Sequence, residues 1–186
     1  SSGRARDPRT EDVALDKVPV GIAGLSVYVP EAFEDSAHIA AQSGIPEQVI
    51  REKFGLKRKH RAAPDEHVSD MAVRAARPLM EQVDPLSIDV VVYFGSPYKD
   101  YPVWSVAPKI QYELGLKRAF TFEIMNVSAG APVMLKVVKD MLTADRSLRQ
   151  VLCVGATREG DLIDYQNQRS RFMFNFGDGA VAVLLR

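Results

Sequence analysis

Ser128 lies in the segment FEIMNVSAGAP, residues 122–132, where a strand is predicted to turn sharply into a helix. A side chain at such a turn stands clear of the sheet. The free N–H groups and the positive dipole end of the following helix can stabilise the oxyanion that forms when an acyl carbonyl is attacked. The next three residues, Ala-Gly-Ala at 129–131, are small enough for a thioester to approach. The pattern is therefore compatible with a residue that accepts an acyl group.

Local sequence leaves three interpretations of Ser128 open. Serine is a good N-cap, worth about 1 kcal/mol, so the residue could simply cap the helix. It could be a reactive hydroxyl, although an alcohol needs an adjacent general base. It could also stand where a thiol was lost or was replaced by engineering. The G-x-S-x-G elbow of hydrolases is not matched, because residue 126 is Asn. Cys153 is not the displaced nucleophile, since VLCVG reads as a buried strand in which Cys is an inert apolar residue.

The elements that must position Ser128 alternate between strands and helices. Apolar runs predict strands at 20–28, 87–96, 119–127, 149–157 and 176–186. Helices are predicted at 37–43, 47–54, 70–83, 105–114 and 130–144, the first capped by Ser36 and the third by Ser69. Residues 56–67 are predicted as a basic loop, and 158–175 as a long polar loop. This alternation predicts an α/β fold with a largely parallel sheet.

Composition limits the classes of function. The chain has 186 residues, with Lys plus Arg and Asp plus Glu at 24 each, so bulk charge does not favour a nucleic-acid partner. Its single cysteine excludes an internal disulfide framework and a cysteine-based zinc site, and no metal site is predicted. No apolar run is long enough to span a bilayer, and no signal peptide is recognised. We expect a cytoplasmic protein with a disordered arm at 1–17 and one domain at 18–186.

Seven motifs, in this order and spacing, resemble the N-terminal half of the β-ketoacyl-acyl-carrier-protein synthase III family of the thiolase superfamily. They are GIAGLSVYVPE, FGLKRKHRAAPDEHVSDMAVRAA, IDVVVYFGS, Pro102 with a helix ending YELG, FEIMNVSAG, VLCVGAT and FGDGAVAVLL. The resemblance covers about residues 20–185. It implies one half of a thiolase-like layered fold, in which a mostly parallel mixed sheet is flanked by helices.

The resemblance also implies roles for individual residues. The nucleophile position, normally Cys, carries Ser128, and the preceding acid is Glu123. Tyr101 matches the aromatic that lines the acyl pocket of the dimer partner; simple packing is the alternative. Arg169 and Arg171 lie near the position of the arginine that binds coenzyme A, and either could be a solvated loop charge. The family's catalytic His and Asn belong to the second half, and none of the three histidines here matches that His.

The expected function is acyl transfer of the 3-oxoacyl-acyl-carrier-protein synthase III type, in fatty acid or polyketide-like biosynthesis. The resemblance implies acyl-coenzyme A as substrate, an acyl carrier protein as a second thioester source, and no cofactor besides these thioesters. It implies a homodimer, or a complementary chain that supplies the second half. The alternative is a non-catalytic subunit whose serine only caps the helix. The basic run 57–61 could contact a diphosphate or an acidic carrier protein, or could be solvated. Gly177 and Gly179 are predicted to serve tight turns or close approach, and Asp178 to hold that turn.

Overall fold

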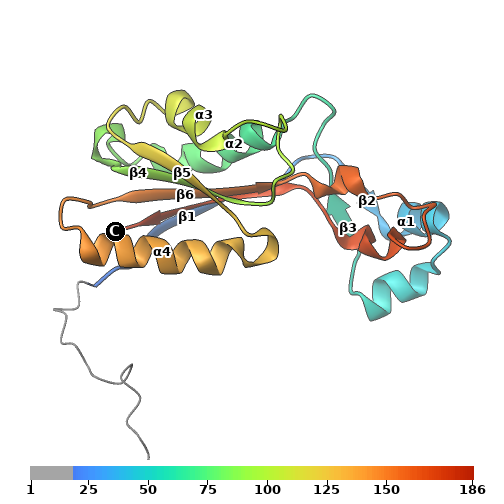
Figure 1. Cartoon of the computed structure of the whole chain (residues 1–186). Helices are drawn as coiled ribbons and strands as arrows, with labels where there is room; N and C mark the ends of the chain where they lie inside the picture. The colour runs from blue at the N-terminus through green and yellow to red at the C-terminus, as the bar shows by residue number, and fades with distance from the viewer. Residues whose placement is uncertain (1–18) are drawn as a thin grey trace, which may run out of the picture.

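The computed structural model describes residues 19–186, and in it five strands form one mixed sheet with helices on both faces (Figure 1). The predicted arm at 1–17 lies outside the described residues. Along the sheet the strand order is β1-β7-β6-β4-β5. The strands are β1 (Ile22–Tyr28), β4 (Val90–Gly95), β5 (Phe120–Met125), β6 (Val151–Thr157) and β7 (Gly179–Leu185).

The sheet divides into a parallel part and an antiparallel part. β4 pairs in parallel with β5 on one side and with β6 on the other. β7 pairs antiparallel with both β6 and β1. The apolar runs of β4 and β6 are buried on both faces, as their sequences predict. Since parallel strands share a direction, the carboxyl ends of β4, β5 and β6 meet at one edge of the sheet.

Helices cover the two faces unequally. On one face, α2 (Val68–Met80) packs on β1, β6 and β7, and α3 (Val106–Glu113) packs on β4 and β5. On the other face, α4 (Gly130–Ala144) lies alone against β4, β5 and β6 (Figure 1). Its buried side chains Met134, Val138 and Leu142 follow the four-residue helical repeat. No helix within residues 19–186 is both long and apolar enough to cross a bilayer.

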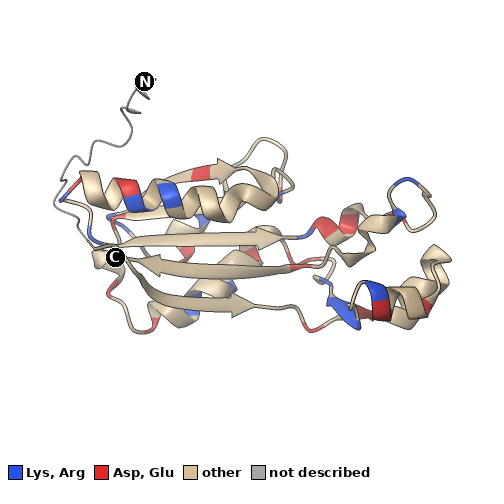
Figure 2. Ribbon diagram, turned by 90° about the horizontal axis from the view of Figure 1, so that it is seen from below, with Lys and Arg blue, Asp and Glu red and all other residues tan. Residues whose placement is uncertain are grey.

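A smaller group of elements lies beyond one end of the sheet (Figures 1 and 2). It contains the two-stranded sheet of β2 (Phe33–Asp35) and β3 (Arg58–His60), the helix α1 (Ser36–Ser43) and a π-helix at Val49–Lys53. The remaining short helices are 3₁₀ turns at Pro85–Ser87, Val127–Ala129, Glu159–Leu162 and Arg171–Asn175. The prediction of a loop throughout 56–67 is therefore wrong, because three-residue strands leave no periodic signal.

Two predicted helix caps are also wrong by one or two residues. Asp35, not Ser36, caps α1, and its carboxylate accepts the N–H of His38 at 2.8 Å. α2 begins after His67, so Ser69 lies inside the helix. In both places two polar residues stand close together, and the choice between them depends on where the chain enters the helix, which local propensity does not determine.

Asp178 links the sheet to the smaller group of elements. Its side chain is fully buried, and its two oxygens accept the N–H of Ala62 at 2.8 Å and that of Gly160 at 3.0 Å. Asp178 accepts backbone N–H groups, as predicted, but these belong to distant segments, so the prediction that it holds its own Gly-Asp-Gly turn is wrong. The flanking glycines serve close approach: a Cβ on Gly177 would lie 3.3 Å from the His60 carbonyl oxygen, and one on Gly179 would lie 3.2 Å from that of Tyr28.

Replacing Asp178 with Ala should lower the free energy of unfolding by about 2–4 kcal/mol, because two buried N–H groups lose their acceptor. Urea denaturation followed by circular dichroism measures this change. The control is Asp65→Ala, which removes an exposed carboxylate in the same part of the chain and should change stability by less than about 0.5 kcal/mol. Equal stability of the two variants would contradict a structural role for Asp178.

Candidate functional site

The turn between β5 and α4 places Ser128 at the carboxyl edge of the sheet. Asn126 follows β5 and donates its N–H to the Gly95 carbonyl oxygen at 3.1 Å. Val127 follows with φ of 45°, and it is the only non-glycine residue between 19 and 186 with a positive φ. Such a conformation is strained for a β-branched residue and costs on the order of 1–3 kcal/mol. Strain of this kind clusters at functional sites, and here it immediately precedes Ser128.

Glycines allow the turn to pack closely over the neighbouring strands. A Cβ on Gly130 would lie 3.3 Å from the Gly95 nitrogen, so the first turn of α4 approaches the end of β4 backbone to backbone. On β6, a Cβ on Gly155 would lie 2.6 Å from the Phe94 ring. The first contact brings α4 close to the sheet at the edge where Ser128 lies, and the second lets the Phe94 ring of β4 lie against β6.

Ser128 does not cap a helix. The residue before α4 is Ala129, and neither Ala129 nor Asn126, at the start of the 3₁₀ turn, makes a side-chain cap. Ser128 is exposed, and within residues 19–186 its hydroxyl has no hydrogen-bond partner. Its N–H has no acceptor in that part of the chain either. The capping interpretation is therefore wrong, and an unused N–H lies beside an exposed hydroxyl.

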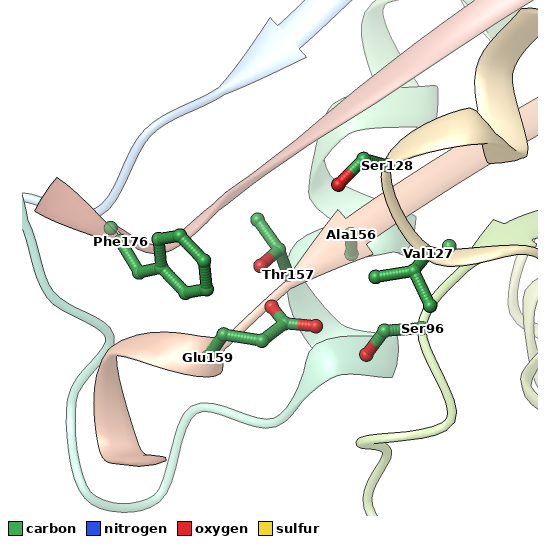
Figure 3. Close-up of a pocket in the computed structure, with 9 residues that line it drawn as sticks. Ser96, Val127, Ser128, Ala156, Thr157, Glu159 and Phe176 are labelled. Carbon is green, nitrogen blue, oxygen red and sulfur yellow. The ribbon is translucent and has the colours of Figure 1, made fainter. Parts of the chain in front are cut away.

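A pocket of about 310 Å³ opens at Ser128 (Figure 3). Its lining comes from the segments at the ends of β4, β5 and β6 and from the segment just before β7. The lining residues are Gly95, Ser96, Val127, Ser128, Ala156, Thr157, Glu159, Phe176 and Gly177. A second hollow of about 320 Å³ shares Ser128 and continues along α4 and β7, where Ala131 and Val181 border it. Together they form a mostly apolar space that Ser128 borders on both sides.

Glu159 is a pocket residue that the sequence analysis did not single out. It begins the 3₁₀ turn after β6, and its carboxylate extends toward the space bordered by Ser96, Thr157 and Ser128 (Figure 3). Its Oε2 is buried and makes no hydrogen bond. The sequence did contain one signal for Glu159: it follows directly after a predicted buried strand. The carboxyl ends of parallel strands meet at one edge of the sheet, where ligands bind.

Glu123 is the one charged residue on the five strands of the large sheet, whose ribbons are otherwise almost free of charge in Figure 2. Its Oε2 accepts a hydrogen bond from Lys99 at 2.8 Å, and its Oε1 accepts the N–H of Val106 at 2.5 Å. Lys99 also donates to the Trp104 carbonyl oxygen at 2.6 Å. Glu123 thus fixes both the loop at 96–105 and the start of α3.

The other predicted site residues do not join Ser128 in its pocket. Tyr101 is 58% exposed and packs edge-to-face on Trp104, with ring centroids 5.6 Å apart. Arg171 donates to the Ser43 carbonyl oxygen at 3.0 Å, which ties its loop to the end of α1. Arg169 is exposed. Within the described chain, therefore, none of the three predicted ligand contacts lines the pocket.

Two residues of the basic run at 57–61, Lys59 and Arg61, have neither of the two roles predicted for that run. Lys59 is only 4% exposed and lies 3.2 Å from Glu34. Arg61 lies 3.0 Å from Asp161 and 3.7 Å from Glu34. These cations are internal partners of acids far away in the sequence, which local composition could not reveal.

Cys153 lies on β6 and is fully buried. Burial raises the pKa of its thiol to about 12. The interpretation of this residue as an inert member of the core is confirmed, and it makes no contribution to the pocket.

Known proteins share this fold. The sequence model of the family described as 3-oxoacyl-[acyl-carrier-protein (ACP)] synthase III matches residues 122–186, which include Ser128 and Glu159. The β-ketoacyl-[acyl-carrier-protein] synthase III of Jannaschia sp. (strain CCS1) is 34% identical over 173 residues, which are 90% of this chain and 51% of that protein. The corresponding protein of Paramagnetospirillum magneticum (strain ATCC 700264 / AMB-1) is 29% identical over 168 residues, 89% of this chain and 50% of that one.

Solved structures agree with the sequence comparison. The priming β-ketosynthase from the R1128 polyketide biosynthetic pathway superposes with a TM-score of 0.79 at 29% identity, covering 89% of this chain and 49% of that chain. The 3-oxoacyl-(acyl carrier protein) synthase III from Pseudomonas aeruginosa PAO1 gives 0.77 at 27% identity, covering 90% and 50%. This chain matches the N-terminal half of the β-ketoacyl-acyl-carrier-protein synthase III proteins. It spans about half the length of the curated relatives it matches, and the predicted thiolase-like fold is confirmed.

Cys153 should resist alkylation by iodoacetamide in the native protein at pH 8. With a pKa of about 12, only about one thiol in ten thousand is ionised at that pH, and burial denies access to the reagent. In guanidinium chloride the same thiol should react completely. Intact mass spectrometry measures both reactions, and fast labelling of native protein would show that the core around β6 opens readily.

Proposed function

We propose that this chain carries the acyl-accepting site of a 3-oxoacyl-acyl-carrier-protein synthase III-type acyltransferase. The observation that carries the proposal is the exposed Ser128 hydroxyl, on a strained turn and in a pocket, at the position where the resembling family has Cys. The unpartnered Ser128 N–H supplies an oxyanion donor without any rearrangement. The adjoining apolar hollow along Ala131 and Val181 provides space for an acyl chain.

In the proposed reaction, the Ser128 oxygen attacks the thioester carbonyl of acyl-coenzyme A. The C–S bond breaks, coenzyme A leaves as the free thiol, and the acyl group remains on Ser128 as an ester. A second acyl unit, presented on coenzyme A or on an acyl carrier protein, then accepts it in fatty acid or polyketide-like synthesis. The thioesters are substrates, and the proposal requires no other cofactor and places the protein in the cytoplasm.

Arg169 is the better candidate of the two loop arginines for a phosphate of coenzyme A. Its side chain is exposed, whereas Arg171 is already engaged with the Ser43 carbonyl oxygen. Arginine suits phosphate because its planar guanidinium makes paired, charge-assisted hydrogen bonds. In this proposal Tyr101, exposed at 58%, reaches the acyl pocket of a second copy.

A partner also forms part of the proposal. β5 pairs with β4 alone among the described strands, so its outer edge is open, and Phe120 on it is 52% exposed. We propose that β5 meets β5 of a second copy in a homodimer. A complementary thiolase-like half, on another chain or in further sequence, would supply the His and Asn that the family uses.

The second candidate is a non-catalytic subunit that pairs with such a complementary half. Exposed apolar side chains favour a covering partner: Leu25 and Val27 on β1 are each 61% exposed, and Leu135 of α4 is 38% exposed. This candidate and the enzyme differ in whether Ser128 ever carries an acyl group.

Incubation with mass-tagged acyl-coenzyme A should add one acyl group to the peptide that contains Ser128. Peptide mapping by mass spectrometry, with and without any co-purifying partner, measures it. Ser128→Ala should abolish the label, while Ser96→Ala, which removes another hydroxyl of the same pocket, should retain it. Absence of label under all conditions, in a protein that still binds its partner, would favour the non-catalytic subunit.

Phe120→Glu should shift the protein from dimer to monomer, because it places a charge on the open edge of β5. Sedimentation velocity over a range of protein concentrations measures the association. The matched control is Leu86→Glu, which replaces an apolar residue of similar exposure, 47%, away from β5. A dimer that survives the Phe120 substitution unchanged would exclude this edge as the interface.

A further inference from the structure

Glu159 is the only acidic or basic side chain among the residues that line the Ser128 pocket. The other polar side chains there, Ser96 and Thr157, are hydroxyls. An alcohol needs a base to attack a thioester at a useful rate. The pocket therefore brings together a hydroxyl without a base and a carboxylate without an assigned role.

The backbone around Glu159 is held on both sides. Before it, Arg158 donates to the Glu66 carbonyl oxygen at 2.6 Å and lies 2.7 Å from Asp161. After it, the N–H of Gly160 donates to Asp178 at 3.0 Å. These contacts hold the 3₁₀ turn in place, so Glu159 is directed into the pocket by a rigid support.

The carboxylate of Glu159 is not neutralised by its surroundings. No Lys, Arg or His within residues 19–186 lies within ion-pair distance of it, and its buried Oε2 has no hydrogen-bond donor. Arg158 beside it pairs with Asp161 instead. On β4, Tyr93 donates to the Ala156 carbonyl oxygen at 3.0 Å, and its pKa is raised by burial and then by the negative charges of Glu123 and Glu159. A carboxylate in this state has a strong preference for a donor, such as water.

We propose that Glu159 is the general base that activates Ser128, acting through one bridging water in the pocket. The inference rests on the proposed function, since it names the base of the same acylation step. Ser128 and Glu159 both line the pocket, yet no direct hydrogen bond joins them. The pocket's volume of about 310 Å³ leaves room for a water between the two groups.

The proton balance of the step is simple. As the Ser128 oxygen bonds to the acyl carbon, its proton passes to the water, and a proton of that water passes to Glu159. When the C–S bond breaks, the same route returns the proton to the departing thiolate. The products are acyl-Ser128, coenzyme A thiol and an ionised Glu159, so no oxidant or additional reactant is needed. The base is thus contributed by this chain itself.

Glu159→Gln keeps the size of the side chain and removes its basicity. We expect the rate of Ser128 acylation by acyl-coenzyme A, followed by intact mass spectrometry, to fall about 10²-fold or more. The matched control is Glu81→Gln, which alters an exposed carboxylate at the end of α2 and should leave the rate unchanged.

The decisive comparison uses Ser128→Cys. A thiol ionises with modest help and depends far less on a base. Glu159→Gln should therefore slow acylation strongly in the wild-type background and only slightly in the Ser128→Cys background. A purely structural role would slow both to the same extent, and that result, or an unchanged rate in the wild-type background, would overturn the proposal. Circular dichroism of each variant verifies that the fold is retained.

A serine-directed sulfonyl fluoride separates this inference from the proposed function, because its reaction with Ser128 needs a base but no coenzyme A. If acyl-coenzyme A labels neither the wild type nor the Ser128→Cys variant, the proposed function fails. The base is then still tested by the rate at which the sulfonyl fluoride modifies wild type and Glu159→Gln. If the Ser128→Cys variant accepts the acyl group and the wild type reacts with neither reagent, the pocket binds thioesters and Glu159 is not a base.

Discussion

The close approach of α4 to the end of β4 is the constraint on which the rest of the site depends. Gly130 and Gly95 meet backbone to backbone, so the chain leaving β5 has almost no space in which to begin its helix. The chain turns at Val127, which adopts a left-handed conformation with φ of 45°. Burial of Met134 and Val138 against the sheet offsets that strain, at roughly 1.5–3 kcal/mol for each fully buried apolar side chain.

The pocket exists because four strand ends converge on this turn. β4, β5 and β6 are parallel and finish at one edge, while β7 begins there in the opposite direction. Asp178 then joins the turn after β6 to the segment before α2 through two backbone amides. A carboxylate between glycines, with no part in the chemistry, therefore determines where Glu159 lies relative to Ser128. The geometry of the site is a property of the sheet edge as a whole.

Sequence was sufficient for the features that depend on local pattern. The apolar runs of β4 and β6, the amphipathic repeat of α4 and the turn at Ser128 were all predictable, because each is encoded by neighbouring residues. Features set by distant contacts were not. From sequence, Lys59 is predicted as a loop charge, whereas the structure pairs it with Glu34. Glu159 is predicted as part of a polar loop, and only the assembled strand ends show that it lines the pocket. The true caps, Asp35 and His67, depend on how the chain approaches each helix.

The lone charge on the strands, Glu123, has a mechanical consequence. The strand that presents Ser128 also anchors, through this carboxylate, the segment that carries Tyr101 and the beginning of α3. A sideways displacement of β5 would consequently be transmitted to Ser128 and to the Tyr101 ring at the same time. In the proposed homodimer, contact along the outer edge of that strand would restrain both segments together, so that association would also affect the shape of the pocket at Ser128.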